Sequence, residues 1–145
     1  MDAARAQKDL YREVVRAHAR APRGAGGLAC ANVRAEAYNA HCGDRVAVSV
    51  AFDDARIGAI GHVTDGCILC VASASLLATH AVGRDRTGAL ALANAVRDLV
   101  QGVDVDDLPG DLRALGGVAA FPSRRACVLL PWDALARALA ASPVS

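Results

Sequence analysis

Cysteine side chains stand at three separated places in this sequence where metal or sulfur chemistry is possible. The first is segment 39–44, which reads NAHCGD and holds the Cys42 thiol and the Asp44 carboxylate two residues apart. Gly43 between them can adopt backbone angles that a side chain forbids, so both groups can turn toward one point. By itself the pattern is a weak signal, because a free cysteine beside an aspartate in a turn is common.

Two further cysteines are predicted to lie beside helix starts. Cys67 directly precedes one helical pattern, and Cys127 ends segment 124–127, just ahead of the final helix. Unpaired backbone N–H groups at a helix start stabilise an anion, so both positions favour a thiolate. With Cys42 and Asp44 they supply three sulfurs and one oxygen, which is a donor set that suits tetrahedral Zn²⁺.

Other pairings of chemically active side chains are weaker. Cys67 and Cys70 form a C-x-x-C at a helix start, the arrangement of thiol–disulfide oxidoreductases, but the βαβ context of those folds is missing. Cys70 is better interpreted as a core residue and Cys30 as a loop thiol. His41 adjoins Cys42 and could compete as a metal ligand. The remaining histidines are single and are interpreted as packed or surface imidazoles; they are His18, His62 and His80.

Composition bounds the class of protein. The chain has 145 residues, 54% of them hydrophobic, and a net charge of +1, so we expect a single domain over residues 1–145 and no nucleic-acid partner. Segment 66–83 is uncharged, but polar side chains interrupt it, so a buried helix explains it better than a membrane span. An odd number of cysteines without a signal peptide favours the cytoplasm.

Hydrophobic periodicity predicts an α+β fold in which helices pack on a small three-stranded antiparallel sheet. The alternation of valines with other residues, which is typical of a strand, is clearest in the middle strand. Asp111 is predicted to cap a short helix. Pro131, in a first-turn position, is predicted to open the last helix. The predicted strands are Val33–Tyr38, Arg45–Phe52 and Ile57–Val63, and the predicted helices before the last are 3–19, 68–82, 87–101 and 112–115.

The order of short motifs along nearly the whole chain resembles the zinc-containing SufU branch of the IscU/NifU N-terminal iron–sulfur assembly proteins. In the IscU branch a His directly precedes the third cysteine, whereas this chain has Ala126 there. Segment 67–127 also carries the extra helical segment and acidic loop that are typical of SufU. The motifs are Leu10-Tyr11-Arg12, His18, Pro22-Arg23, Cys42-Gly43-Asp44-Arg45, Gly66-Cys67, Ala72-Ser73-Ala74-Ser75, Gly117-Val118, Phe121-Pro122, Arg124, Cys127 and Trp132.

This resemblance implies a ligand set and an activity. It implies that Cys42, Asp44, Cys67 and Cys127 bind zinc and that Arg124 is the basic residue beside them. It also implies a sulfurtransferase-like role, in which a pyridoxal-phosphate cysteine desulfurase of the SufS type delivers persulfide sulfur. A His of that enzyme would replace Cys42 on zinc, and the freed thiolate would attack the persulfide. The sulfur would then pass to the SufBCD scaffold complex.

Three positions depart from the usual family pattern, and two other functions stay open. The usual Asn-Pro-Thr before the first cysteine is Asn39-Ala40-His41 here, Leu129 replaces a Thr, and Ala126 replaces a Lys. These departures concern the docking of partners more than the metal site. One alternative is a scaffold that assembles an Fe–S cluster on the same ligands, although Ala126 in place of the His weighs against it. The other is a zinc-stabilised interaction module without sulfur chemistry.

Overall fold

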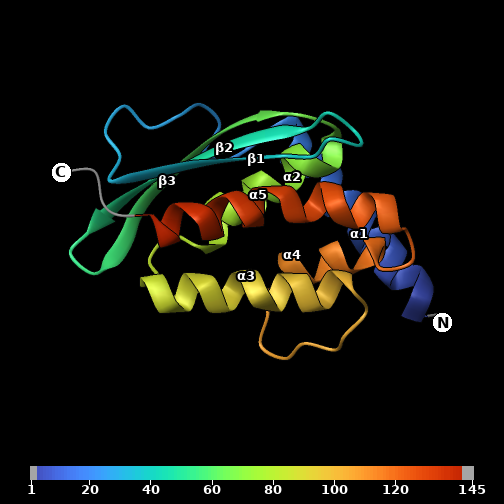
Figure 1. Ribbon diagram of the computed structural model, residues 1–145. Coiled ribbons are helices and arrows are strands. Elements are labelled where there is room, and N and C mark those ends of the chain that lie inside the picture. Colours follow the sequence, from blue (N-terminus) through green and yellow to red (C-terminus); the bar gives the residue numbers. More distant parts are fainter. Residues whose placement is uncertain (1–2, 142–145) are drawn as a thin grey trace.

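The structure is a computed structural model that describes residues 3–141, with a three-stranded antiparallel sheet in the order β1-β2-β3 and helices on one of its faces (Figure 1). This arrangement confirms the predicted α+β class. In chain order the elements are α1 (Ala3–Arg20), β1 (Val33–Tyr38), β2 (Arg45–Asp53), β3 (Arg56–Asp65), α2 (Ile68–His80), α3 (Arg86–Val100), α4 (Gly110–Arg113), the 3₁₀ helix η1 (Ala114–Val118) and α5 (Pro122–Ala140).

The central strand β2 places its valines on the helix-covered face of the sheet. Val46, Val48 and Val50 are fully or almost fully buried, as a period of two requires when one face is covered. Ser49 lies on the opposite face of the sheet and is also buried. Its hydroxyl accepts the backbone N–H of Leu28, which belongs to the loop after α1. That loop therefore covers part of the second face of the sheet.

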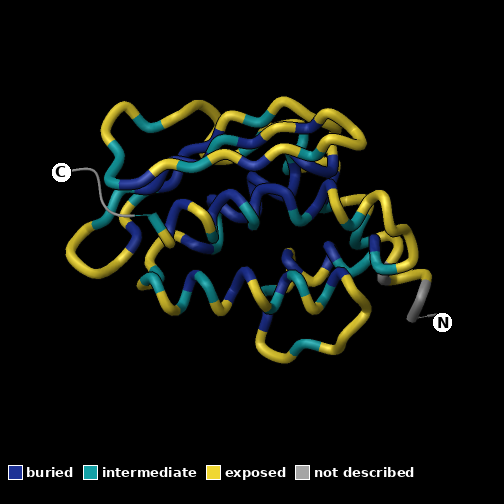
Figure 2. The backbone as a smooth tube through the Cα atoms, in the orientation of Figure 1, coloured by how far each residue is buried: buried dark blue, intermediate teal, exposed yellow. Residues whose placement is uncertain are grey.

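Helices α2 and α5 form the layer directly under the sheet, and α3 packs on the far side of α5 (Figure 1). The backbone of this middle layer is predominantly buried (Figure 2). The two helices share a polar contact inside the apolar core: the Ser73 hydroxyl donates to the carbonyl of Val128 at 2.6 Å and accepts the indole N–H of Trp132 at 3.0 Å. Both side chains are completely buried, so the contact fixes α2 and α5 in one register.

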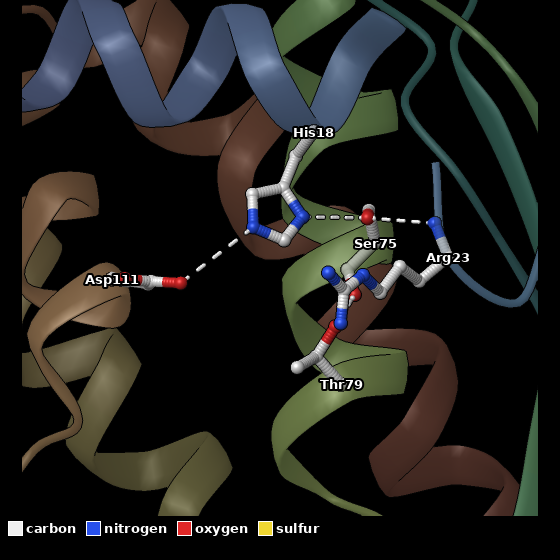
Figure 3. A network of polar contacts seen from close by, with 5 residues as sticks. All are labelled: His18, Arg23, Ser75, Thr79 and Asp111. Carbon is white, nitrogen blue, oxygen red and sulfur yellow. Dashed lines mark hydrogen bonds and ion pairs between the residues drawn. The ribbon is translucent and has the colours of Figure 1, made fainter. Parts of the chain in front are cut away.

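Helix α1 contacts α2 through a hydrogen bond and α4 through an ion pair (Figure 3). The Ser75 hydroxyl of α2 is bonded to Nδ1 of His18 at 2.7 Å and accepts the backbone N–H of Arg23 at 2.8 Å. Nε2 of His18 lies 3.8 Å from the carboxylate of Asp111. Burial lowers the pKa of His18, against the opposing effect of Asp111. The imidazole is thus a packed group, as the sequence analysis expected.

The last helix differs from its prediction. Pro131 does not open it; α5 begins at Pro122 and runs through Pro131. An interior proline removes a helical hydrogen bond, at a cost of about 3 kcal/mol or more. Here the helix continues because both sides of the proline pack in the core, where Val128 and Trp132 are completely buried. Pro122 stands in the first turn, where the missing N–H would have no partner in any case.

The remaining helices and strands agree closely with their predicted ranges, apart from the cap of α4. The cap of α4 is Pro109, so the prediction that Asp111 caps this helix is wrong, and Asp111 lies instead in its first turn. The three strands and the helices α1 to α3 agree with their predicted ranges to within two residues. Across residues 3–141, no helix combines the length and apolarity that crossing a lipid bilayer requires.

Candidate metal centre

A tight turn between β1 and β2 orients Cys42 and Asp44. The backbone N–H of Asn39 donates to the carbonyl of Asp44, and the N–H of Gly43 donates back to the carbonyl of Asn39 at 2.8 Å. Gly43 has a φ of +78°, which side chains rarely adopt, so the chain can reverse there. Consequently the Cys42 thiol stands exposed at the tip of the turn, whereas Asp44 points inward and is only 6% exposed.

Asp44 is held against the backbone of Gly66, which ends the loop after β3. A Cβ atom at Gly66 would lie 2.8 Å from the carboxyl carbon of Asp44, so this position has no room for a side chain. One carboxylate oxygen of Asp44 is completely buried and has no hydrogen-bond partner among the described residues. A buried carboxylate oxygen without a partner is costly and is stabilised by a cation.

Cys67 and Cys127 come from the two helices of the middle layer. Cys67 is the N-cap of α2 in an extended conformation, as predicted, and its thiol is exposed. Cys127 is buried, but the prediction that it lies ahead of its helix is wrong. It stands in the second turn of α5, beyond the first four N–H groups that a helix leaves unpaired. Its thiol instead contacts the carbonyl of Ser123 at 3.5 Å.

The fold brings three of the four predicted ligands together. One ligand atom each from Cys42, Asp44 and Cys127 lies within 4.8 Å of the others. Tetrahedral zinc with Zn–S bonds of about 2.3 Å separates two sulfurs by roughly 3.8 Å, so this spacing fits one ion. Cys67 is outside that group of three but lies beside it, close enough to raise the pKa of the Cys127 thiol.

The electrostatics of the site disfavour additional negative charge. Burial raises the pKa of the Cys127 thiol, and the neighbouring acidic groups of Cys67, Cys42 and Asp44 raise it further. Burial and the same neighbours also raise the pKa of Cys70, which is fully buried in α2 as the core residue predicted from the sequence. Two or three thiolates and a carboxylate can share this volume only if a cation compensates them.

Arg124 lies at the edge of this cluster together with Tyr11. The Arg124 guanidinium stacks over the Phe121 ring, with 4.6 Å to the ring centroid, and lies close enough to the Tyr11 phenol to affect its pKa. Burial raises the pKa of Tyr11, while Arg124 acts in the opposite direction. Gly117 allows this packing, because a Cβ there would lie 2.7 Å from the Tyr11 ring. Tyr11 was not among the candidate site residues predicted from the sequence, because its contact with Gly117 joins positions that are distant along the chain.

The other candidate residues lie apart from the three-residue group. His41 is exposed, and its backbone N–H donates to the side chain of Asn39. Cys30 is an exposed free thiol. His62 is buried in β3, where its Nε2 donates to the carbonyl of Arg23 at 2.8 Å. Neither Cys70 nor any histidine belongs to the group of possible ligands found among residues 3–141.

Comparisons with known proteins agree with this fold and this donor set. A profile of the NifU-like N terminal domain matches residues 10–141. The chain belongs to the NifU-like N-terminal domain family. Over 133 residues it is 35% identical to the zinc-dependent sulfurtransferase SufU of Bacillus subtilis strain 168, covering 90% of each chain. Over 132 residues it is 34% identical to the iron–sulfur cluster assembly scaffold protein IscU of Streptococcus pyogenes serotype M1, covering 90% of this chain and 82% of that one.

Solved structures place this NifU-like chain among the same relatives. A putative iron–sulfur cluster assembly scaffold protein for the SUF system from Fervidobacterium islandicum AW-1 superimposes with a TM-score of 0.83 at 26% identity, over 90% of this chain and 97% of that one. A hypothetical protein at 32% identity gives a TM-score of 0.85, over 92% of this chain and 99% of that one. These likenesses confirm the predicted SufU/IscU-type fold.

Proposed function

We propose that this chain is a zinc-dependent sulfur acceptor in Fe–S cluster assembly. Its donor would be a pyridoxal-phosphate cysteine desulfurase of the SufS type, and its own acceptor would be the SufBCD scaffold complex. Similarity to a relative named as a zinc-dependent sulfurtransferase supports the proposal. Transfer would take place in the cytoplasm, where reducing conditions keep the cysteines as free thiols.

The observation that carries this proposal is the exposure of Cys42 within the group of three, since Cys67, which is also exposed, lies outside that group. Asp44 and Cys127 are buried, whereas the Cys42 thiol stands exposed at a turn tip, within 4.8 Å of ligand atoms from both. Only an accessible sulfur can be attacked by, or attack, a group on another protein, because thiol–disulfide exchange needs direct S–S approach. An exposed sulfur in such a group is one that a second protein can reach.

The proposed transfer exchanges one S–S bond for another. The Cys42 thiolate attacks the terminal sulfur of the donor persulfide, R–S–SH, and forms a new S–S bond. The donor's S–S bond breaks, and its inner sulfur leaves as a thiolate, R–S⁻. The proton of the persulfide stays on the transferred sulfur, so the product is Cys42–S–SH and no external oxidant or reductant is consumed.

Zinc, when bound, would keep the Cys42 sulfur deprotonated, since metal-ligating cysteines are thiolates. The residues that would hold it are Cys42, Asp44 and Cys127, with Cys67 as the fourth ligand. Asp44 is a harder donor than a thiolate and should hold zinc less firmly than a fourth cysteine would. Arg124, whose guanidinium reaches Tyr11 at the edge of the cluster, would offset part of the remaining negative charge.

The direct test is anaerobic persulfide transfer from the cognate desulfurase, with mass spectrometry on Cys42. We expect the wild-type chain to gain one sulfur atom at Cys42 and to stimulate desulfurase turnover. Cys42→Ala should abolish both effects, whereas Cys30→Ala, which removes another exposed thiol, should leave them unchanged. Full stimulation by Cys42→Ala would remove this thiol from the mechanism, and unchanged turnover on adding the wild-type protein would favour a zinc-stabilised interaction module.

Assembly of an Fe–S cluster on the same ligands is the second candidate function, because a relative of 34% identity is named as a cluster assembly scaffold. The ligand types allow it, since thiolates bind both zinc and iron. Metal analysis of protein purified without oxygen separates the two functions. Sulfur transfer predicts zinc without iron or sulfide. Iron and sulfide in comparable amounts would instead support the scaffold.

A further inference from the structure

Helix α1 carries a row of exposed basic side chains. Their spacing of three and four residues puts them on one face of the helix, and at all five positions the residue is exposed. None of the five forms an ion pair with another residue in the part of the chain that the structure describes. This basic row consists of Arg5, Lys8, Arg12, Arg16 and Arg20.

The basic row forms the wall of two adjoining grooves. The first groove, of about 690 Å³, is lined by Cys67 among others, and the second, of about 710 Å³, is lined by Phe121 among others. Arg12, Tyr11 and Arg124 line both. The two grooves therefore run along α1 on either side of these shared residues, and one of them reaches a predicted zinc ligand.

The grooves have apolar floors as well as basic walls. The apolar residues that line the first groove are Val15, Ala19, Ile68 and Leu69. Ile68, which directly follows Cys67, is 65% exposed. Glycine and alanine residues around η1 line the second. Large exposed apolar side chains beside a polar rim are typical of protein interaction sites.

The charged side chains that line the two grooves are all positive. Six cations line the two grooves, the basic row and Arg124, and no Asp or Glu lines either of them. The whole chain has a net charge of only +1, so the positive charge here is local. The nearest acids on α1, Asp9 and Glu13, are exposed and do not line the grooves.

We propose that the basic row and its two grooves are the docking surface for an acidic segment with an apolar face that belongs to the sulfur donor. Acidic side chains of the segment would pair with the basic row while its apolar side chains cover Ile68 and the groove floors. The segment would thereby hold the donor at the Cys67 end of the surface, next to the metal centre in which Cys42 is the proposed acceptor of the persulfide sulfur. This inference rests on the proposed function, since it takes the donor to be the desulfurase.

Other occupants fit the surface less well. A second copy of the chain docking through the same face would set two basic rows against each other, which is destabilising. The phosphates of a nucleic acid would pair with the basic row, but they would make no favourable contact with the apolar residues that line the grooves. Both are kept as outcomes of the test.

The test compares two double charge reversals. Arg12→Glu/Arg16→Glu changes the centre of the basic row, and Arg34→Glu/Arg137→Glu makes the same change in net charge at exposed positions outside both grooves. Glu and Arg have similar helix propensities, so α1 should persist. Thermal melting and zinc content of each variant check that the fold and the metal site are intact.

Binding of the cognate desulfurase is measured by calorimetry at low and high salt. We expect Arg12→Glu/Arg16→Glu to raise Kd at least tenfold at low salt, with a smaller effect at high salt, and the control variant to bind as wild type. Loading of Cys42 should slow at limiting desulfurase and recover as its concentration rises. Lys replacements of acidic desulfurase residues should restore binding of the reversed chain.

Equal Kd values for the two variants would overturn the docking surface. So would a wild-type dimer that Arg12→Glu/Arg16→Glu makes monomeric while desulfurase affinity is unchanged, or loss of binding to a nucleic-acid probe with desulfurase affinity unchanged. Failure of the proposed function is a separate result: wild-type Cys42 gains no sulfur even at saturating desulfurase, whatever the affinities are.

Discussion

Asp44 combines two properties that conflict unless a cation is present. It is buried, and one of its carboxylate oxygens lacks a hydrogen-bond partner among the described residues. In a metal-free protein such a group is destabilising, whereas in the zinc form it would be a ligand. The same side chain should therefore lower the stability of one form and raise that of the other.

Asp44→Asn tests this conflict, because it keeps the shape of the side chain and removes its charge. We expect the metal-free variant to melt at a higher temperature than the metal-free wild type, and to gain less stability when zinc is added. Thermal melting with chelator and with excess zinc provides both comparisons. An unchanged gain from zinc would show that Asp44 is not a ligand.

Gly66 is the residue that gives Asp44 its position. In Gly66→Ala the new Cβ would lie 2.8 Å from the Asp44 carboxyl carbon, so the carboxylate must move. We expect zinc affinity, measured by competition with a chromogenic chelator, to fall by about tenfold or more, in the range of mutations that disturb the support of metal ligands. Gly110→Ala is the matched control, because a Cβ there meets nothing within 4 Å.

At the scale of the elements, α2 and α5 must keep their relative position for Cys67 and Cys127 to stay close together. Ser73 links the two helices six residues after Cys67, and Trp132 does so five residues after Cys127, in each case between one and two helical turns away. Because both partners are completely buried, their hydrogen bond cannot be replaced by water. The link thus couples core packing to the geometry of the site.

A double-mutant cycle with Ser73→Ala and Trp132→Phe measures this link. We expect each single change to destabilise the protein and the two to be non-additive, with a coupling of about 1 kcal/mol, the net value of a buried hydrogen bond. Urea unfolding of the metal-free protein supplies the four free energies. Additive effects would mean that the two side chains act independently.

At the scale of the whole molecule, three histidines make stability depend on pH. Burial lowers the pKa of His18, His62 and His80 below the ordinary value of about 6.5. Below pH 6.5 the unfolded chain therefore binds more protons than the folded chain, and each further drop in pH toward the folded-state pKa values favours unfolding. Above that value, these groups cause no such loss.

We therefore expect the unfolding free energy of the metal-free protein to fall as pH is lowered from 7.5 to about 5. Urea unfolding in the presence of chelator measures it without competition from zinc. His62→Gln, which keeps a donor for the carbonyl of Arg23, should show a shallower dependence on pH. A flat profile in the wild type would mean that the three imidazoles titrate alike in both states.

Most of the secondary structure could be predicted from the sequence, because the signals are local. Alternating valines in β2 and the helical period after Gly66 need only neighbours in the chain to be interpreted, and their ranges are confirmed. The last helix was placed wrongly because a proline is normally excluded from a helix interior. Only tertiary packing decided that α5 continues through Pro131, since the buried residues around it stabilise more than the lost hydrogen bond costs.

The donor set was likewise visible in the sequence, since thiols and a carboxylate at three sites suggest a metal whatever the fold. Which of these atoms lie close together, however, depends on the tertiary packing. It buries Asp44 behind Gly66, leaves Cys42 exposed, and brings Cys127 in from a helix interior rather than a helix start. The physical reason is that residue types and turn chemistry are local properties, whereas burial and distance between ligands depend on how α2, α5 and the β1–β2 turn pack together.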